Sequence, residues 1–126
     1  MTITSYWHTL HDDTLPWIKI VFAHEYNLRK LKILQTEQAN YRFKDVIIEF
    51  SEGSRYNYTL KNGNDWISLE LPDVTRSQYV KITRKSGWGP LGLGYTGISK
   101  ILAFGYRTGN FYYGMIIRTK SLTINF

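Results

Sequence analysis

The sequence predicts an all-β domain, a sandwich or a barrel, and three observations point to that class. Short runs of apolar, β-branched and aromatic residues recur along the chain, and turn residues separate them at spacings of about 8 to 12 positions. Aromatic residues make up 16% of the chain, which suits half-buried, pleated strands. No segment has the sustained apolar stripe of a helix. At 126 residues the chain is expected to form one domain around one core.

The strands are expected in a simple order. Turn chemistry at Ser51-Glu52-Gly53-Ser54 predicts a hairpin between the runs 46–50 and 56–60. The Asn62-Gly63 pair marks a second turn, and the alternating run 66–71 after it is expected to end at Pro72, because proline cannot donate to a ladder. The other expected strands are 16–22, 28–34, 79–83 and 98–104.

Charge and cysteine content limit the classes of partner. The net charge of +6 favours anions in general, but the basic residues are spread along the chain, as they are on solvent-facing sides of strands. The chain has no cysteine, which excludes disulfides and cysteine-ligated zinc. No signal peptide is visible after Met1, so a mature or a cytoplasmic N-terminus fits equally.

Motifs for catalysis are sparse. The histidines are His8, His11 and His24, and no nucleophile elbow or phosphate-binding loop accompanies them. Acidic residues beside His11, at positions 12 and 13, fit a metal site or, more simply, a solvated turn. The glycine-rich run 87–97 has no helix after it and is expected to be a surface loop. We therefore expect a binding domain, not an enzyme, with no cofactor and no metal.

The order of five segments resembles a known family. These segments are Ser5-Tyr6-Trp7-His8-Thr9; Leu15-Pro16-Trp17-Ile18-Lys19-Ile20; Tyr41-Arg42-Phe43-Lys44-Asp45-Val46 with Glu49-Phe50-Ser51-Glu52-Gly53; Gln78-Tyr79-Val80-Lys81-Ile82; and Gly94-Tyr95-Thr96-Gly97-Ile98 up to Phe104-Gly105. Over residues 5–105 the chain resembles the discoidin-like domains, which include the coagulation factor V and VIII type C domains and the family 32 carbohydrate-binding modules. The resemblance implies a galactose-binding-like jelly-roll β-sandwich whose loops at one end bind a sugar, an anionic phospholipid or a protein.

The resemblance also implies site residues. The positions that bind sugar in the carbohydrate-binding branch are occupied here by His8, Arg42 and Tyr95, with Arg42 expected to face solvent. His11 stands where many members have a second aromatic residue, and Trp88 offers an additional aromatic surface. An aromatic ring stacks on a sugar ring, while imidazole and guanidinium groups bond its hydroxyls. The structural alternatives are that His8 caps a loop, Arg42 pairs with Glu37 or Asp45, and Tyr95 packs in the core.

Departures from the family pattern lead to further expectations. Lys100 stands where a glutamate would complete a calcium site, so no calcium site of the family type is expected. We expect a sandwich over 1–105 that is short at its N-terminus, and an extension over 106–126. Strand-like runs in that extension, 111–118 and 121–126, are expected to fill the open sheet edge within one chain or between two copies, as a homo-oligomer.

Three functions follow from this, in order of preference. The first is lectin-like recognition of a galactose-type carbohydrate. The second is an adhesion module for anionic phospholipid or protein, with Trp88, Leu91 or Leu93 as apolar contacts beside Arg84 and Lys85. We do not expect nucleic-acid binding, because no recognised nucleic-acid-binding motif accompanies the positive charge. The resemblance favours an extracellular or cell-surface location.

Overall fold

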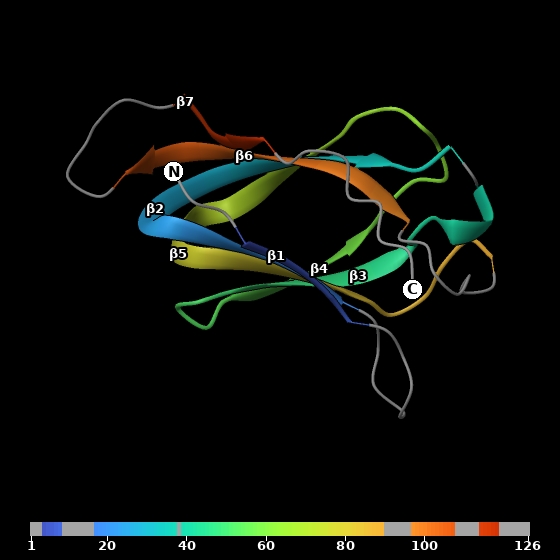
Figure 1. Cartoon of the computed structure of the whole chain (residues 1–126), viewed down its shortest axis with the longest axis horizontal. Helices are drawn as coiled ribbons and strands as arrows, with labels where there is room; N and C mark the ends of the chain where they lie inside the picture. The colour runs from blue at the N-terminus through green and yellow to red at the C-terminus, as the bar shows by residue number, and fades with distance from the viewer. Residues whose placement is uncertain (1–3, 9–16, 38, 90–96, 108–113, 119–126) are drawn as a thin grey trace.

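A computed structural model describes residues 4–8, 17–37, 39–89, 97–107 and 114–118 (Figure 1). The expectations that concern His11, Leu91, Leu93, Tyr95 and residues 119–126 lie outside this part. The elements are β1 (Thr4–His8), β2 (Trp17–Gln35), the 3₁₀ turn η1 (Ala39–Tyr41), β3 (Asp45–Phe50), β4 (Arg55–Thr59), β5 (Ile67–Arg84), β6 (Ile98–Arg107) and β7 (Gly114–Arg118). The all-β prediction is confirmed. No helix in the described ranges is long and apolar enough to cross a membrane.

Two long bent strands organise the molecule. Residues 17–22 and 28–34 of two predicted strands form the two halves of β2, and residues 67–71 and 79–83 of two others lie within β5. The first half of β2, from Trp17 to Val21, pairs with 79–83 of β5, and the second half pairs with 67–77. Both strands turn at the same end of the molecule and pass from one layer of the sandwich into the other (Figure 1). The sequence predicts four separate strands here because the bends interrupt the alternation of apolar residues.

The prediction that Pro72 ends its strand was wrong. Lys30 of β2 pairs with Glu70, and Leu28 pairs with Thr75, so the pairing is out of register between these positions. Pro72 therefore lies where β5 has no paired residue in β2, and its missing N–H removes no bond of that ladder. A proline in a strand is tolerated at such an irregularity.

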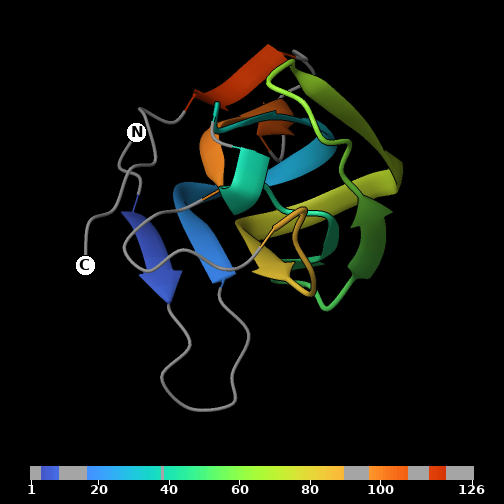
Figure 2. The same cartoon turned by 90° about the vertical axis from the view of Figure 1, so that its right-hand side faces the viewer.

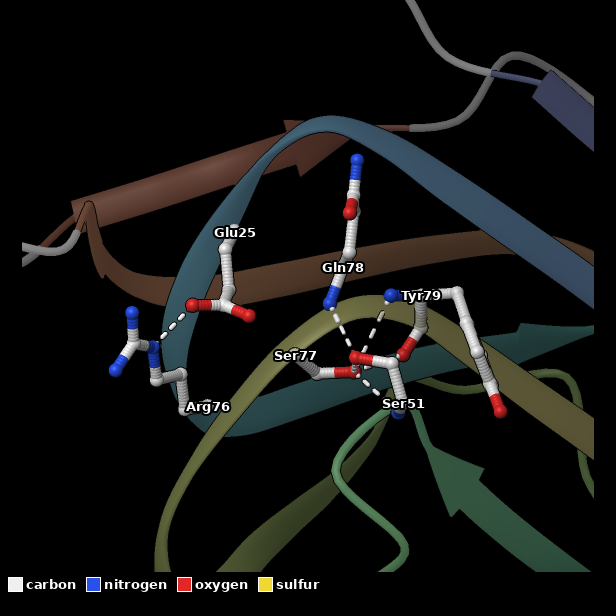
Figure 3. A network of polar contacts seen from close by, with 6 residues as sticks. All are labelled: Glu25, Ser51, Arg76, Ser77, Gln78 and Tyr79. Atoms are coloured by element: carbon white, nitrogen blue, oxygen red, sulfur yellow. Dashed lines mark hydrogen bonds and ion pairs between the residues drawn. The ribbon is translucent and has the colours of Figure 1, made fainter.

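A polar network holds β5 at its bend (Figure 3). Ser77 is fully buried, and its hydroxyl accepts the Ser51 N–H at 2.8 Å while donating to the Tyr79 carbonyl at 2.5 Å. The Ser51 hydroxyl accepts the Gln78 N–H at 2.8 Å. An ion pair between Arg76 and Glu25 joins this bend to that of β2. The network satisfies backbone groups that the ladder leaves open.

The strands form one curled antiparallel sheet that folds into two layers. One layer has the order β4-β3-β5-β2-β1, and the other has the order β5-β2-β6-β7. β1 pairs with the first half of β2 and β6 with the second half, along the edge opposite β5. β6 runs two residues beyond Gly105, and β7 pairs with it as the outermost strand among the described residues. The division of the chain at residue 105 stays a prediction.

The core lies between the layers. Buried side chains alternate along the strands, as in Val46, Ile48 and Phe50 of β3. In β2 the alternation of buried residues is interrupted by a β-bulge at Arg29. Leu28 and Lys30 pair with the successive residues Gly105 and Phe104 of β6, so Arg29 is an extra residue without a partner in that ladder. The bulge places Leu28, Leu31 and Ile33 on the core side together. The predicted hairpin between β3 and β4 is confirmed, with Gly53 at a φ of 108° in its turn.

Candidate functional site

The η1 turn after β2 and the segment that follows β5 meet the start of β6 at the end of the sandwich opposite the bends (Figure 2). The backbone of Phe43 forms a bridge with Gly87, and the Thr36 N–H donates to the Gly97 carbonyl at 2.8 Å. These contacts bring the segments around Arg42 and Trp88 and the start of β6 together. We call this region the loop end.

His8 also belongs to the loop end through its backbone. It is the last residue of β1 and pairs with Trp17, which pairs with Thr83 near the end of β5. The register thus places His8 at the same end as Arg42 and Trp88. The contacts of its imidazole lie outside the described part of the chain.

Arg42 is buried, contrary to the expectation that it faces solvent. Only 9% of its surface is exposed. Its guanidinium donates to the Thr36 carbonyl at 2.8 Å, the Glu37 carbonyl at 3.0 Å and the Asn62 Oδ1 at 2.9 Å. The group therefore joins the end of β2 to the turn after β4, because one planar cation can satisfy several acceptors at fixed angles.

Trp88 is exposed but firmly held. The indole is 40% exposed, and its Nε1–H donates to the Leu60 carbonyl at 3.0 Å. Its backbone N–H donates to the Arg42 carbonyl at 3.0 Å, and the Lys44 ammonium lies over the ring, 4.9 Å from its centre. The polar edge of the ring is thus engaged by the protein, while part of its surface remains available to a ligand.

Arg84 supports the loop that carries Trp88. Its Nη2 donates to the Gly89 carbonyl at 3.0 Å, and its guanidinium carbon lies 6.0 Å from the centre of the Phe43 ring. Its Nε is buried and has no hydrogen-bond partner among the described residues. Burial lowers the pKa of the Arg84 guanidinium. This arginine is therefore placed to hold the loop, not to meet a ligand in solvent.

A pocket of about 160 Å³ opens beside these residues. We call it the Asp45 pocket; it is lined by Asp45, Val46, Asn57, Tyr58, Thr59 and Lys85. The carboxylate of Asp45 accepts the Thr59 hydroxyl at 2.8 Å and the Ser86 hydroxyl at 2.9 Å. These two hydrogen bonds, aided by Lys44 and Lys85, lower the pKa of Asp45. The pocket thus contains a fixed anion among neutral and cationic donors.

Sequence reasoning missed the pocket residues. Thr59 and Asp45 become neighbours only through the pairing of β3 with β4. The weak signal available was the polar residues Asn57 and Thr59 alternating with tyrosines in the predicted strand. That pattern also fits any strand with one solvated face, and it did not distinguish a site.

The comparisons with known proteins bear on the fold. No family model matches the sequence, and no curated protein matches it either. Among solved structures, the chain is similar to the family 32 carbohydrate-binding module of Clostridium perfringens NanJ, solved with galactose, at 14% identity and a TM-score of 0.53. The match covers 67% of this chain and 66% of that one.

Two further structures extend the comparison. A fucose-binding module of Streptococcus pneumoniae has a TM-score of 0.52 at 21% identity, over 83% of this chain and 73% of that chain. The mycobacterial arabinofuranosyltransferase AftD matches with a TM-score of 0.63 at 15% identity. That match covers 92% of this chain, which spans 9% of the transferase.

The fold is therefore the galactose-binding-like jelly-roll β-sandwich of the discoidin-like domains, as the order of the sequence segments predicted. At these identities the likeness establishes the fold and leaves the ligand to be argued from the site.

Proposed function

We propose that this chain is a non-catalytic carbohydrate-binding module that recognises a galactose-type sugar at its loop end. The observation that carries the proposal is Trp88, an exposed indole that the protein holds in place by its polar edge. Sugar rings have apolar faces that stack on such a ring. Two solved neighbours of the same fold bind galactose and fucose, which supports a sugar as the ligand.

The proposed site combines stacking with directional hydrogen bonds. His8 and Tyr95 are proposed as further ligand contacts because of the sequence resemblance. For Arg42 we propose that the N–H groups not used by Thr36, Glu37 and Asn62 reach a sugar hydroxyl at the protein surface. Each such hydrogen bond nets about 0.5 to 1.5 kcal/mol, so a single site should bind weakly. High overall affinity would then require several copies of the module, or several sites, to bind the same carbohydrate at once.

The chemistry of Asp45 favours binding over catalysis. A general acid at neutral pH needs a raised pKa, whereas two hydroxyl donors lower the pKa of Asp45. Glu25 and Glu49, in turn, lie beside Arg76 and Arg55. The environment of Asp45 therefore favours its ionised form, which suits a hydrogen-bond acceptor for a sugar.

Galactose titrations of the parent and of Trp88→Ala test the proposal. Loss of the stacking surface should weaken galactose binding about tenfold, which is the change that about 1.4 kcal/mol produces. Trp66→Ala is the matched control, since Trp66 is exposed to 39% and does not line the Asp45 pocket. Trp66→Ala should bind as the parent does. Unfolding curves of both variants show whether either change affects the fold.

Liposome sedimentation tests the alternative function, which is adhesion to anionic phospholipid. Binding of neutral sugar should not change with salt, whereas adhesion to anionic phospholipid should weaken as salt rises. If Trp88→Ala binds galactose as the parent does, the proposed site is wrong. If the parent binds anionic liposomes but neither galactose nor fucose, the adhesion function replaces the carbohydrate function.

A further inference from the structure

We infer that the Asp45 pocket is a second ligand subsite and that it takes a sugar unit bearing a carboxylate, such as a uronic acid. The inference rests on the proposed function, because it takes the ligand to be a carbohydrate. It adds a site that the expected residues His8, Arg42 and Tyr95 do not include. The pocket residues come from β3, β4 and the residue after β5.

The acceptor of the pocket is fixed before a ligand arrives. Thr59 bonds one oxygen of the Asp45 carboxylate and Ser86 bonds the other. An ionised carboxylate has about four acceptor positions, so each oxygen keeps capacity for a ligand hydroxyl. The carboxylate needs no rearrangement to bind, which reduces the entropy cost of recognition.

The hydrogen-bond donors of the pocket lie on the same side of the sheet as Asp45. Asn57 precedes Thr59 by two residues along β4, so both project to the same, outer side of the sheet. Lys85 and Asn57 are both exposed. An amide and an ammonium group beside a carboxylate match a ligand that both donates and accepts hydrogen bonds, as sugar hydroxyls do.

The charge balance favours an acidic sugar over a neutral one. Lys44 and Lys85 lie near enough to Asp45 to help lower its pKa, so two cations accompany one carboxylate. The ion pairs within 4.0 Å in the described part of the chain are Arg55 with Glu49 and Arg76 with Glu25. The Lys85 ammonium thus lacks an ion-pair partner there. A ligand carboxylate would pair with Lys85, while its hydroxyls would donate to Asp45. A phosphate or sulfate group without hydroxyls would face the Asp45 carboxylate with nothing to donate.

The pocket also adjoins the Trp88 surface. The Trp88 indole donates to the carbonyl of Leu60, the residue after Thr59, and the Leu60 N–H donates to the carbonyl of Lys44, the residue before Asp45. The pocket volume of about 160 Å³ equals the liquid volume of roughly five waters, which is enough for part of one sugar unit. An oligosaccharide could then place a neutral unit on Trp88 and an acidic unit in the pocket.

Paired titrations with galacturonate and galactose test the inference. The two sugars share a ring and differ in the carboxylate at C6. Followed by ¹⁵N-edited NMR, galacturonate should shift the amide signals of Asn57 and Thr59, and should bind about five- to tenfold tighter than galactose at low salt. Lys85→Gln should remove that preference. Lys81→Gln is the matched control, because Lys81 lies on the same outer face of the sheet as Asp45 but does not line the pocket. Its ammonium lies 4.9 Å from the centre of the Trp17 ring.

The outcomes separate this inference from the proposed function. If Trp88→Ala loses galactose binding but galacturonate still shifts Asn57 and Thr59, both hold. If galactose binds through Trp88 while galacturonate shows no preference, or keeps its preference in Lys85→Gln, the pocket inference is overturned and the function stands. Potassium sulfate is the remaining probe, because sulfate near neutral pH has no hydroxyl to donate to Asp45. If it shifts the same amides as strongly as galacturonate does, the pocket is a general anion site and the inference is wrong.

Discussion

Lys19 of β2 and Lys81 of β5 lie directly opposite each other in the antiparallel ladder. Like charges in that position destabilise a sheet, yet here each ammonium reaches an aromatic ring of the other strand. Lys19 lies 4.2 Å from the centre of the Tyr79 ring, and Lys81 lies 4.9 Å from that of Trp17. The two cation–π contacts draw the charges apart and let a basic chain keep lysines in the middle of its sheet.

The contact between Lys81 and Trp17 should be measurable as a coupling energy. In a double-mutant cycle with Lys81→Gln and Trp17→Leu, we expect the pair to contribute about 0.5 to 1 kcal/mol to the free energy of unfolding. Urea denaturation of the parent, both single variants and the double variant gives this quantity. Simple additivity of the two changes would show that the contact contributes nothing to stability.

Arg42→Ala should destabilise the fold. The change leaves three acceptors near Arg42 without their donor, and we expect a loss of about 3 kcal/mol or more in the free energy of unfolding. Arg42→Lys should recover little, since an ammonium cannot reproduce the planar arrangement. The control is Arg55→Ala, because the Arg55 side chain is 61% exposed, and there we expect less than about 1 kcal/mol. Equal effects at both arginines would contradict the structural role of Arg42.

Gly105→Ala should separate β2 from β6 at the bulge. A Cβ on Gly105 would come within 2.0 Å of the Asn27 backbone oxygen, which cannot move without displacing β2. Overpacking of this kind costs about 1 to 3 kcal/mol. Gly63→Ala is the matched control, as a Cβ there meets nothing within 4 Å. Thermal unfolding of both variants tests the difference, and an unchanged melting temperature for Gly105→Ala would refute it.

Asp45 should make stability depend on pH in the acid range. The pKa of Asp45 is below its ordinary 3.8 in the folded state, so the unfolded chain binds the proton more readily. Its contribution is therefore complete above about pH 5 and is lost as the pH falls through the folded pKa. The difference in free energy of unfolding between the parent and Asp45→Asn should shrink from pH 6 to pH 3. A difference that stays constant would show that Asp45 is not the titrating group.

A chelator should change the melting temperature little. The described residues contain no group of three or more potential metal-ligating side chains, and Lys100 stands at the position that the family would use for calcium. Metal bound to the folded state would raise its stability by mass action, so removal of that metal would lower the melting temperature. A fall of many degrees in scanning calorimetry with EDTA would reveal a metal site.

The sequence alone determined the class of the fold, because β-sheets follow from local pattern. The alternation in Val46 to Phe50 and the turn chemistry around Gly53 predicted a hairpin that the structure contains. These signals lie within a few residues of one another, and each strand of a sheet with one buried face shows them independently. The order of such segments was also enough to identify the galactose-binding-like fold.

Only the tertiary structure decided how each predicted site residue is held and how much of it is exposed. Arg42 and Trp88 were both predicted at the loop end, but the fold buries the guanidinium among backbone carbonyls and leaves the indole exposed. The continuity of β2 and β5 through their bends and the meeting of Asp45 with Thr59 likewise depend on strand pairing. Burial and hydrogen-bond partners are properties of segments far apart in the chain, and no local pattern encodes them.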